Sequence, residues 1–240
     1  PPPFFLPPPP RIPDPLWSRG LGDVYKRQGF TFGAYEALPE GTPRGGVVVI
    51  QEIFGVNDHI REVTDGYAQA GYAAIAPQIF DRAERNIELG YEEADMGRGV
   101  GLAFQETERG DTLKDLQASV EAAGKYGKVG VVGYCYGGLL TWLSACGLSG
   151  ITCASAYYGG GIAGELEQVA KCPVIMHFGE LDAHIPMTDV EKIKAALPDV
   201  DVHVYAADHG FNCDHRASHD AASAELARER TLTFFGEHVG

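Results

Sequence analysis

Short apolar runs alternate with amphipathic stretches along most of the chain. Six apolar runs bounded by glycine, proline or charged residues predict buried strands, at residues 45–51, 72–77, 128–134, 151–159, 172–180 and 200–207. Stretches with helical spacing lie between and after them, at residues 58–71, 111–127, 137–147, 190–197 and from about residue 218 onward. This alternation predicts an α/β domain with a mostly parallel central sheet and helices on both faces.

One long segment departs from the alternation. Residues 81–110 are polar and only weakly periodic. Long excursions of this kind run over the surface of α/β domains and often carry binding residues. We expect this one to cross the carboxyl edge of the sheet and to shape a substrate pocket.

The first 28 residues differ from the rest in composition. They are rich in proline and show neither helical nor strand periodicity. Their last six residues, DVYKRQ, resemble the translation of a sequencing-library adapter. We therefore expect a disordered or non-native segment at residues 1–28 and a single α/β domain at residues 29–240.

Composition narrows the classes of function. The chain has 240 residues, 45% hydrophobic content and a net charge of -14, without a block of lysine and arginine, which argues against nucleic-acid binding. No apolar run approaches the roughly 20 residues that a membrane span needs. The five cysteines are an odd number without C-x-x-C spacing, which is typical of free thiols in a reducing compartment. We expect a monomeric cytoplasmic protein that binds neither nucleic acid nor membrane.

A cysteine lies between a predicted strand and a predicted helix. The segment Gly133-Tyr134-Cys135-Tyr136-Gly137 has the pattern of a nucleophile elbow, with cysteine in place of the usual serine. The glycines allow the neighbouring backbone to approach the sharp turn, and the positive potential at a helix start favours a thiolate. Taken alone, the motif also fits a buried structural cysteine in a glycine-rich turn.

Two further residues complete a catalytic set. Asp182 follows the predicted strand at 172–180, and His209 follows the one at 200–207. In the α/β-hydrolase fold, the acid and then the histidine follow the nucleophile in the chain, each at the end of a later strand. The order Cys135, Asp182, His209 therefore predicts an α/β-hydrolase fold with a cysteine nucleophile.

A carboxylate ends the most apolar strand. Glu52 lies in VVVIQEIFG, where burial of a charge is costly unless the group is paired or used in catalysis. By position, the N–H groups of Ile53 and Tyr136 are the candidate oxyanion hole. Glu52 beside them is a candidate acceptor for the thiol proton of Cys135, or alternatively the partner of a structural arginine.

These segments together resemble one family. QEIFGVNDHIRE, GYAAIAPQIFDR, KVGVVGYCYGG, GELDAHIP and DHGFNCDHR, in this order, resemble dienelactone hydrolases (carboxymethylenebutenolidases), and the resemblance covers about residues 30–239. It implies Cys135 as nucleophile, Asp182 and His209 as its partners, and Glu52 as the group that takes the thiol proton. It also implies that Arg82 binds the carboxylate of an anionic lactone, a task suited to a bidentate guanidinium.

One position departs from the family pattern. Relatives close to the chlorocatechol pathway carry a second arginine four residues after the catalytic histidine, whereas this chain has Cys213 there and Arg216 three residues later. The expected substrate is a small ester or lactone similar to dienelactone, with other carboxylic esters and thioesters as alternatives.

Two rival functions are weighed against hydrolysis. His209, Cys213, His215 and His219 are close in sequence, but they lack a preceding ligand pair of zinc-site spacing, so we expect neither a metal nor another cofactor. A binding module in which Cys135 only senses redox state is also possible. Such a module has no need for Asp182, His209 and Glu52 together, and this favours the hydrolase.

Overall fold

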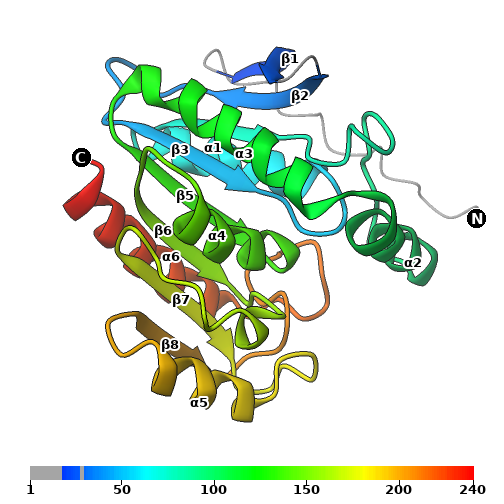
Figure 1. Cartoon of the computed structure of the whole chain (residues 1–240), viewed down its shortest axis with the longest axis vertical. Helices are drawn as coiled ribbons and strands as arrows, with labels where there is room; N and C mark the ends of the chain where they lie inside the picture. The colour runs from blue at the N-terminus through cyan, green and yellow to red at the C-terminus, as the bar shows by residue number, and fades with distance from the viewer. Residues whose placement is uncertain (1–17, 28–29) are drawn as a thin grey trace, which may run out of the picture.

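The protein is built around one twisted sheet (Figure 1). The computed structural model describes residues 18–27 and 30–240, with side chains from residue 30 onward. The strands run in the order β1-β2-β4-β3-β5-β6-β7-β8, antiparallel from β1 to β4 and parallel from β4 to β8. Their bounds are Ser18–Arg27 (β1), Phe30–Ala37 (β2), Gly46–Ile50 (β3), Ala73–Pro77 (β4), Val129–Tyr134 (β5), Ile151–Tyr157 (β6), Val174–Gly179 (β7) and Asp201–Tyr205 (β8).

Helices cover both faces of this sheet (Figure 1). They are α1 (Asp58–Gln69), α2 (Glu93–Gly101), the π-helical turn η1 (Leu102–Glu106), α3 (Arg109–Ala123), α4 (Tyr136–Gly147), α5 (Met187–Ala196) and α6 (Ala221–His238), with short 3-10 turns η2 (Gly124–Tyr126) and η3 (Ile162–Gly164). On one face α1 packs against α6, with the Tyr67 and Phe235 rings 5.9 Å apart. The other face carries α3 and α4 (Figure 1). The predicted α/β-hydrolase architecture is confirmed.

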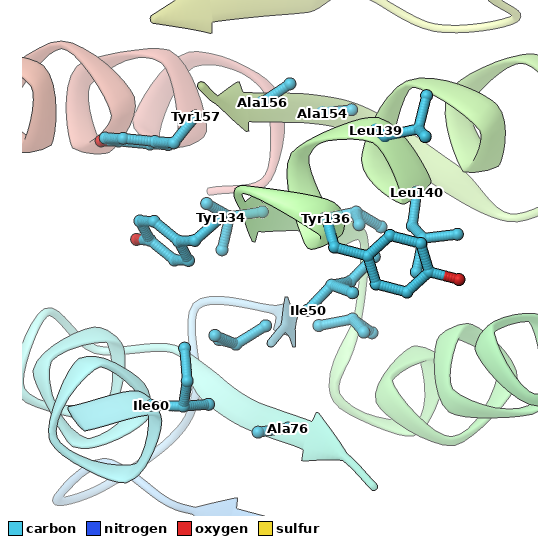
Figure 2. Packing of buried hydrophobic residues seen from close by; sticks show 14 of the residues in the cluster. Ile50, Ile60, Ala76, Tyr134, Tyr136, Leu139, Leu140, Ala154, Ala156 and Tyr157 are labelled. Carbon is cyan, nitrogen blue, oxygen red and sulfur yellow. The ribbon is translucent and has the colours of Figure 1, made fainter. Parts of the chain in front are cut away.

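Strand register brings the chemistry to one edge of the sheet. Ile50, the last residue of β3, pairs with Gly133 of β5, and Tyr134 pairs with Tyr157 of β6. Because parallel strands that end in register have their carboxyl ends side by side, the residues that follow them gather at that edge. Side chains of β3 and α4, including Ile50, Tyr136 and Leu140, pack in one apolar cluster that fixes this arrangement (Figure 2).

The N-terminal segment differs in part from expectation. The sequence places residues 1–28 outside the domain, whereas the structure pairs Ser18–Arg27 with β2 as an additional antiparallel strand. Without β1, β2 would be the edge of the sheet, and an edge strand offers free backbone groups with which another extended segment can pair. The other residues of that predicted segment lie outside the described residues.

The predicted excursion contains more regular structure than its weak periodicity indicates. Within it, α2 and η1 form a short helical unit between β4 and α3. Three side chains of this unit line the pocket at Cys135, namely Met96, Val100 and Phe104. The segment therefore shapes a pocket, as predicted. Among the residues that the structure describes, no helix has both the length and the apolar character to cross a bilayer.

Candidate active site

Cys135 occupies a sharp turn between β5 and α4. Its φ of 55° and ψ of -114° are unusual for a non-glycine residue, as expected of a strained elbow. The flanking glycines are required sterically. A Cβ on Gly133 would lie 2.1 Å from the Gly137 carbonyl oxygen, and one on Gly137 would lie 2.3 Å from that of Ile50.

Gly137→Ala is expected to lower the free energy of unfolding by about 1–3 kcal/mol, because the new methyl group meets backbone atoms that have no room to move. Gly147, at the other end of α4, is a matched control, because no atom lies within 4 Å of the place that a methyl group would take there. Gly147→Ala is expected to be neutral or to stabilise the helix by up to about 1 kcal/mol. Urea unfolding measures both, and equal effects of the two substitutions would contradict the steric requirement.

The three predicted catalytic side chains form a continuous chain of contacts. His209 Nε2 lies 3.1 Å from Cys135 Sγ, and His209 Nδ1 lies 2.7 Å from Asp182 Oδ2. The other Asp182 oxygen accepts hydrogen bonds from the N–H groups of His184 and Ile185, at 2.8 and 3.1 Å. These bonds fix the carboxylate so that it orients the imidazole toward the sulfur.

The surroundings of His209 and Asp182 favour a protonated imidazole beside an ionised carboxylate. Burial acts to lower the pKa of His209, but hydrogen bonds with Asp182 and Cys135 outweigh it and raise the pKa to about 10. For Asp182, burial acts to raise the pKa, whereas the hydrogen bonds from His209 and the backbone lower it below its usual value. Asp182 therefore stays ionised and supports a protonated imidazole.

Glu52 lies deep in the same region, with 1% of its surface exposed. Burial raises the pKa of Glu52, although Arg216 and then His209 counteract the rise. The Arg216 guanidinium is 3.6 Å from one carboxylate oxygen, and neither oxygen accepts a hydrogen bond from a described residue. Glu52 does pair with an arginine, but that arginine also faces the pocket beside Cys135, so the pair belongs to the site.

A pocket of about 440 Å³ opens at Cys135, within the size range of small-molecule sites. Its walls combine a mostly apolar lining with two arginines and two histidines. They comprise Ile53, Phe54, Met96, Val100, Phe104, Arg109, Cys135, Tyr136, Leu139, Gly160, Gly161, Glu165, His184, His209 and Arg216. Such a lining suits a small, partly apolar molecule that carries a negative group.

Both residues of the candidate oxyanion hole lie at the pocket. Ile53 and Tyr136 both line the pocket with Cys135. Tyr136 is the first residue of α4, where an N–H has no acceptor within the helix. Their role as donors stays a prediction.

Arg82 does not lie where the resemblance implies. Its guanidinium donates to both oxygens of Asp115, at 2.6 and 2.8 Å, and its carbon atom lies 4.3 Å from the centre of the Phe30 ring. It is not among the residues that line the pocket. The physical reason is that the buried carboxylate of Asp115 binds the Nε and Nη2 edge of the guanidinium and holds the side chain outside the pocket.

Some relatives carry an arginine at the position of Cys213. In this protein Arg216, three residues later, reaches the pocket instead. Two successive turns, with N–H groups of Cys213 and Arg216 bonded to carbonyls of Gly210 and Cys213, carry the chain back toward the site. Cys213 itself is buried, with its sulfur 3.3 Å from the Tyr91 hydroxyl. Sequence position alone gives no sign of these turns. Arg109, the other pocket arginine, lies in the weakly patterned segment and also carries no sequence signal.

The four residues of the zinc alternative have separate surroundings. His209 contacts Cys135 and Asp182, and His219 Nδ1 lies 3.0 Å from the Phe211 carbonyl oxygen. Among the described residues, Cys213 lies near Glu52 and His59, whereas His215 lies in a different group of potential ligands. That particular set of four is therefore not assembled.

The fold and this arrangement define an α/β hydrolase with cysteine at the elbow. A sequence model described as the dienelactone hydrolase family matches residues 32–239. The chain belongs to the dienelactone hydrolase family, and membership places it among carboxylic ester hydrolases, as its motifs imply.

Individual relatives agree over most of the chain. A putative carboxymethylenebutenolidase of Synechocystis sp. is 37% identical over 209 residues, which is 79% of this chain and 84% of the relative. The carboxymethylenebutenolidase of Pseudomonas putida is 33% identical over 221 residues, which is 88% of this chain and 93% of the relative. The crystal structure of a putative dienelactone hydrolase from Klebsiella pneumoniae superposes with a TM-score of 0.79 at 31% identity, covering 90% and 98% of the two chains.

Proposed function

We propose that the protein hydrolyses a small anionic lactone or ester through a cysteine nucleophile and a thioester intermediate. The observation that carries the proposal is the contact chain Cys135, His209, Asp182, with distances of 3.1 and 2.7 Å, at the floor of an open pocket. A nucleophile within hydrogen-bond reach of a base, which is itself oriented by a third group, is the signature of covalent catalysis.

The first half of the reaction forms the thioester. The thiol proton of Cys135 passes to Glu52, whose raised pKa makes it a better proton acceptor than an exposed carboxylate. The sulfur attacks the substrate carbonyl carbon, and the N–H groups of Ile53 and Tyr136 stabilise the oxyanion. As the carbon–oxygen bond of the ester breaks, protonated His209 donates its proton to the departing oxygen.

The second half releases the acid. Neutral His209, held by Asp182, removes a proton from a water molecule that attacks the thioester carbonyl. The carbon–sulfur bond then breaks, the sulfur leaves as thiolate beside the imidazolium, and the proton held by Glu52 returns to the sulfur to restore the starting state. The product of a lactone is one hydroxy acid, whereas an open ester gives an acid and an alcohol.

The charge of the pocket favours an anionic substrate. The overall net charge of -14 repels anions, so recognition of a carboxylate needs local cations. Arg216 and Arg109 both line the pocket. Arg109 is engaged by Glu165 at 2.6 Å, whereas Arg216 lies 3.6 Å from its nearest carboxylate, without a hydrogen bond to it. Arg216 is therefore the better placed to bind a substrate carboxylate.

Arg216→Gln is expected to lower kcat/KM about 10- to 100-fold more for an anionic substrate than for a neutral one, because a charged hydrogen bond contributes about 1.5–3 kcal/mol. Steady-state rates with cis-dienelactone and p-nitrophenyl hemisuccinate are compared with those for p-nitrophenyl acetate. Arg82→Gln is the matched control, since that side chain lies outside the pocket, and its effect should be equal for both substrate classes.

Two outcomes would count against the proposal. Equal losses on anionic and neutral esters in Arg216→Gln, or a selective loss in Arg82→Gln, would remove Arg216 from carboxylate binding. Absence of turnover of every ester and lactone by the unaltered protein would contradict the hydrolase itself.

A further inference from the structure

A cluster of potential metal ligands lies outside the pocket. His59, Glu62, Asp214 and His215 place one donor atom each within 4.8 Å of all the others. Two come from the first turns of α1, three residues apart and therefore on one helix face. The other two lie in the segment between β8 and α6 that also carries His209 and Arg216.

The donor atoms of the cluster are close enough for small movements of the exposed side chains to place them around one ion. Asp214 Oδ1 lies 3.3 Å from His59 Nδ1 and 3.9 Å from His215 Nε2, and His215 Nε2 lies 2.7 Å from Glu62 Oε2. Ligands about 2.1 Å from a tetrahedral ion are about 3.4 Å from one another. Two imidazoles and two carboxylates are a donor set that suits divalent transition metals such as Zn²⁺.

His59 supplies a second, independent observation. Only 1% of its surface is exposed, and its Nε2 has no hydrogen-bond partner among the described residues. A ring nitrogen of His59 also lies within 4.8 Å of the Glu52 carboxylate and the Cys213 sulfur. Histidines that bind metals through one nitrogen usually direct the other N–H toward a carboxylate. Ligation through Nδ1 gives the buried Nε2 a proton to direct toward Glu52.

An ion has access to this cluster from solvent. Glu62 and Asp214 are exposed, and His215 is about one-third exposed. The strongly acidic surface of the protein attracts cations to it. Bound there, an ion ties α1 to the segment that carries His209 and Arg216.

We propose that His59, Glu62, Asp214 and His215 bind one divalent transition-metal ion of the Zn²⁺ type, and that this ion clamps the His209 segment to α1. The proposed role is structural, since none of the four ligands is among the residues that line the pocket at Cys135, and the inference stands independently of the proposed substrate.

The test uses the full chain with Cys135→Ser, dialysed against a chelator, so that the elbow thiol cannot bind the ion. Zn²⁺ at about 100 times its dissociation constant is expected to raise the melting temperature by about 5–10 °C, with one ion per chain by calorimetry. Adding His215→Ala, or Glu62→Gln, is expected to weaken binding at least about 10-fold. His203→Ala, which removes a half-buried histidine paired with Asp201 elsewhere, is the matched control and should bind normally.

Co²⁺ identifies the ligands directly. The proposed site predicts visible ligand-field bands without a thiolate charge-transfer band, and no change in Cys213→Ser. Unchanged affinity in His215→Ala, equal weakening in His203→Ala, or a thiolate band that Cys213→Ser removes would each overturn the assignment. So would the absence of one-to-one binding of Zn²⁺ by the chain with all four ligands intact.

Discussion

Cys135→Ala is expected to lower kcat by about 10⁶-fold, the loss seen when the nucleophile of a comparable triad is removed. The sulfur is the atom that forms the covalent bond, and no other described nucleophile touches His209 Nε2. The fold should survive, because alanine is smaller than cysteine and Cys135 is only half-buried. Steady-state ester hydrolysis measures the loss, and circular dichroism and urea unfolding report the fold.

A second cysteine provides the control for that experiment. Cys172 is also half-buried but lies outside the pocket, so Cys172→Ala should retain the full rate. Mass spectrometry after quenching with acid should find an acyl group on the peptide that contains Cys135 and on no other. A Cys135→Ala rate within tenfold of the unaltered protein, or acyl transfer to Cys172, would refute the nucleophile assignment.

The sequence was sufficient to predict the residues placed by strand ends. Cys135, Asp182 and His209 each follow a strand of the parallel sheet, and parallel strands in register bring their carboxyl ends together whatever lies between them. Glu52 was identifiable for the same reason, since it follows β3. For these residues, local periodicity and topology determine position, and both can be recognised in one sequence.

The sequence could not predict where the arginine side chains lie, because their positions depend on which partners they bind in the folded protein. Arg82 stands at the sequence position that the family resemblance indicates, but in space its guanidinium binds Asp115, 33 residues further along, outside the pocket. Arg216 reaches the pocket through two turns whose backbone bonds leave no pattern in the side chains. Long side chains bind partners that are near them in the folded protein, and spacing along the sequence does not predict these partners.

The proposed metal site could not be predicted either, because its ligands also come together only in the folded protein. Of the histidines singled out by sequence proximity, His209 and His219 have other partners and His215 belongs to the proposed site. His59 and Glu62 come from a helix about 150 residues away from Asp214 and His215. Ligands from distant elements meet only when α1 packs beside the segment that follows β8. If an ion occupies this cluster, it stabilises the same segment that delivers His209 to Cys135 and Arg216 to the pocket.

Asp182→Asn is expected to lower kcat by up to about 10⁴-fold while the backbone stays in place. An asparagine oxygen can still accept the bonds from the N–H groups of His184 and Ile185. Its amide then donates to His209 Nδ1, which forces the ring proton onto Nε2, the nitrogen that faces Cys135. The imidazole in that tautomer cannot accept a proton from water beside the thioester. Formation of the thioester should slow as well, because an uncharged imidazole is a poorer proton donor to the departing oxygen than the imidazolium. Single-turnover and steady-state rates of ester hydrolysis measure the two losses.

The same substitution tests the electrostatic argument. Removal of the carboxylate should lower the pKa of His209 from about 10, because the carboxylate hydrogen bond and charge both favour the imidazolium. A histidine whose folded pKa exceeds its unfolded value stabilises the fold most below pH 6.5, and this contribution disappears as the pH rises toward 10. The loss of stability in Asp182→Asn relative to the unaltered protein should thus be larger at pH 6 than at pH 10. Asp208→Asn is the control, since among the described residues that exposed carboxylate accepts a bond only from the His209 backbone N–H, at 2.6 Å. An NMR titration of His209 that shows the same pKa in both variants would mean that Asp182 does not hold the imidazolium.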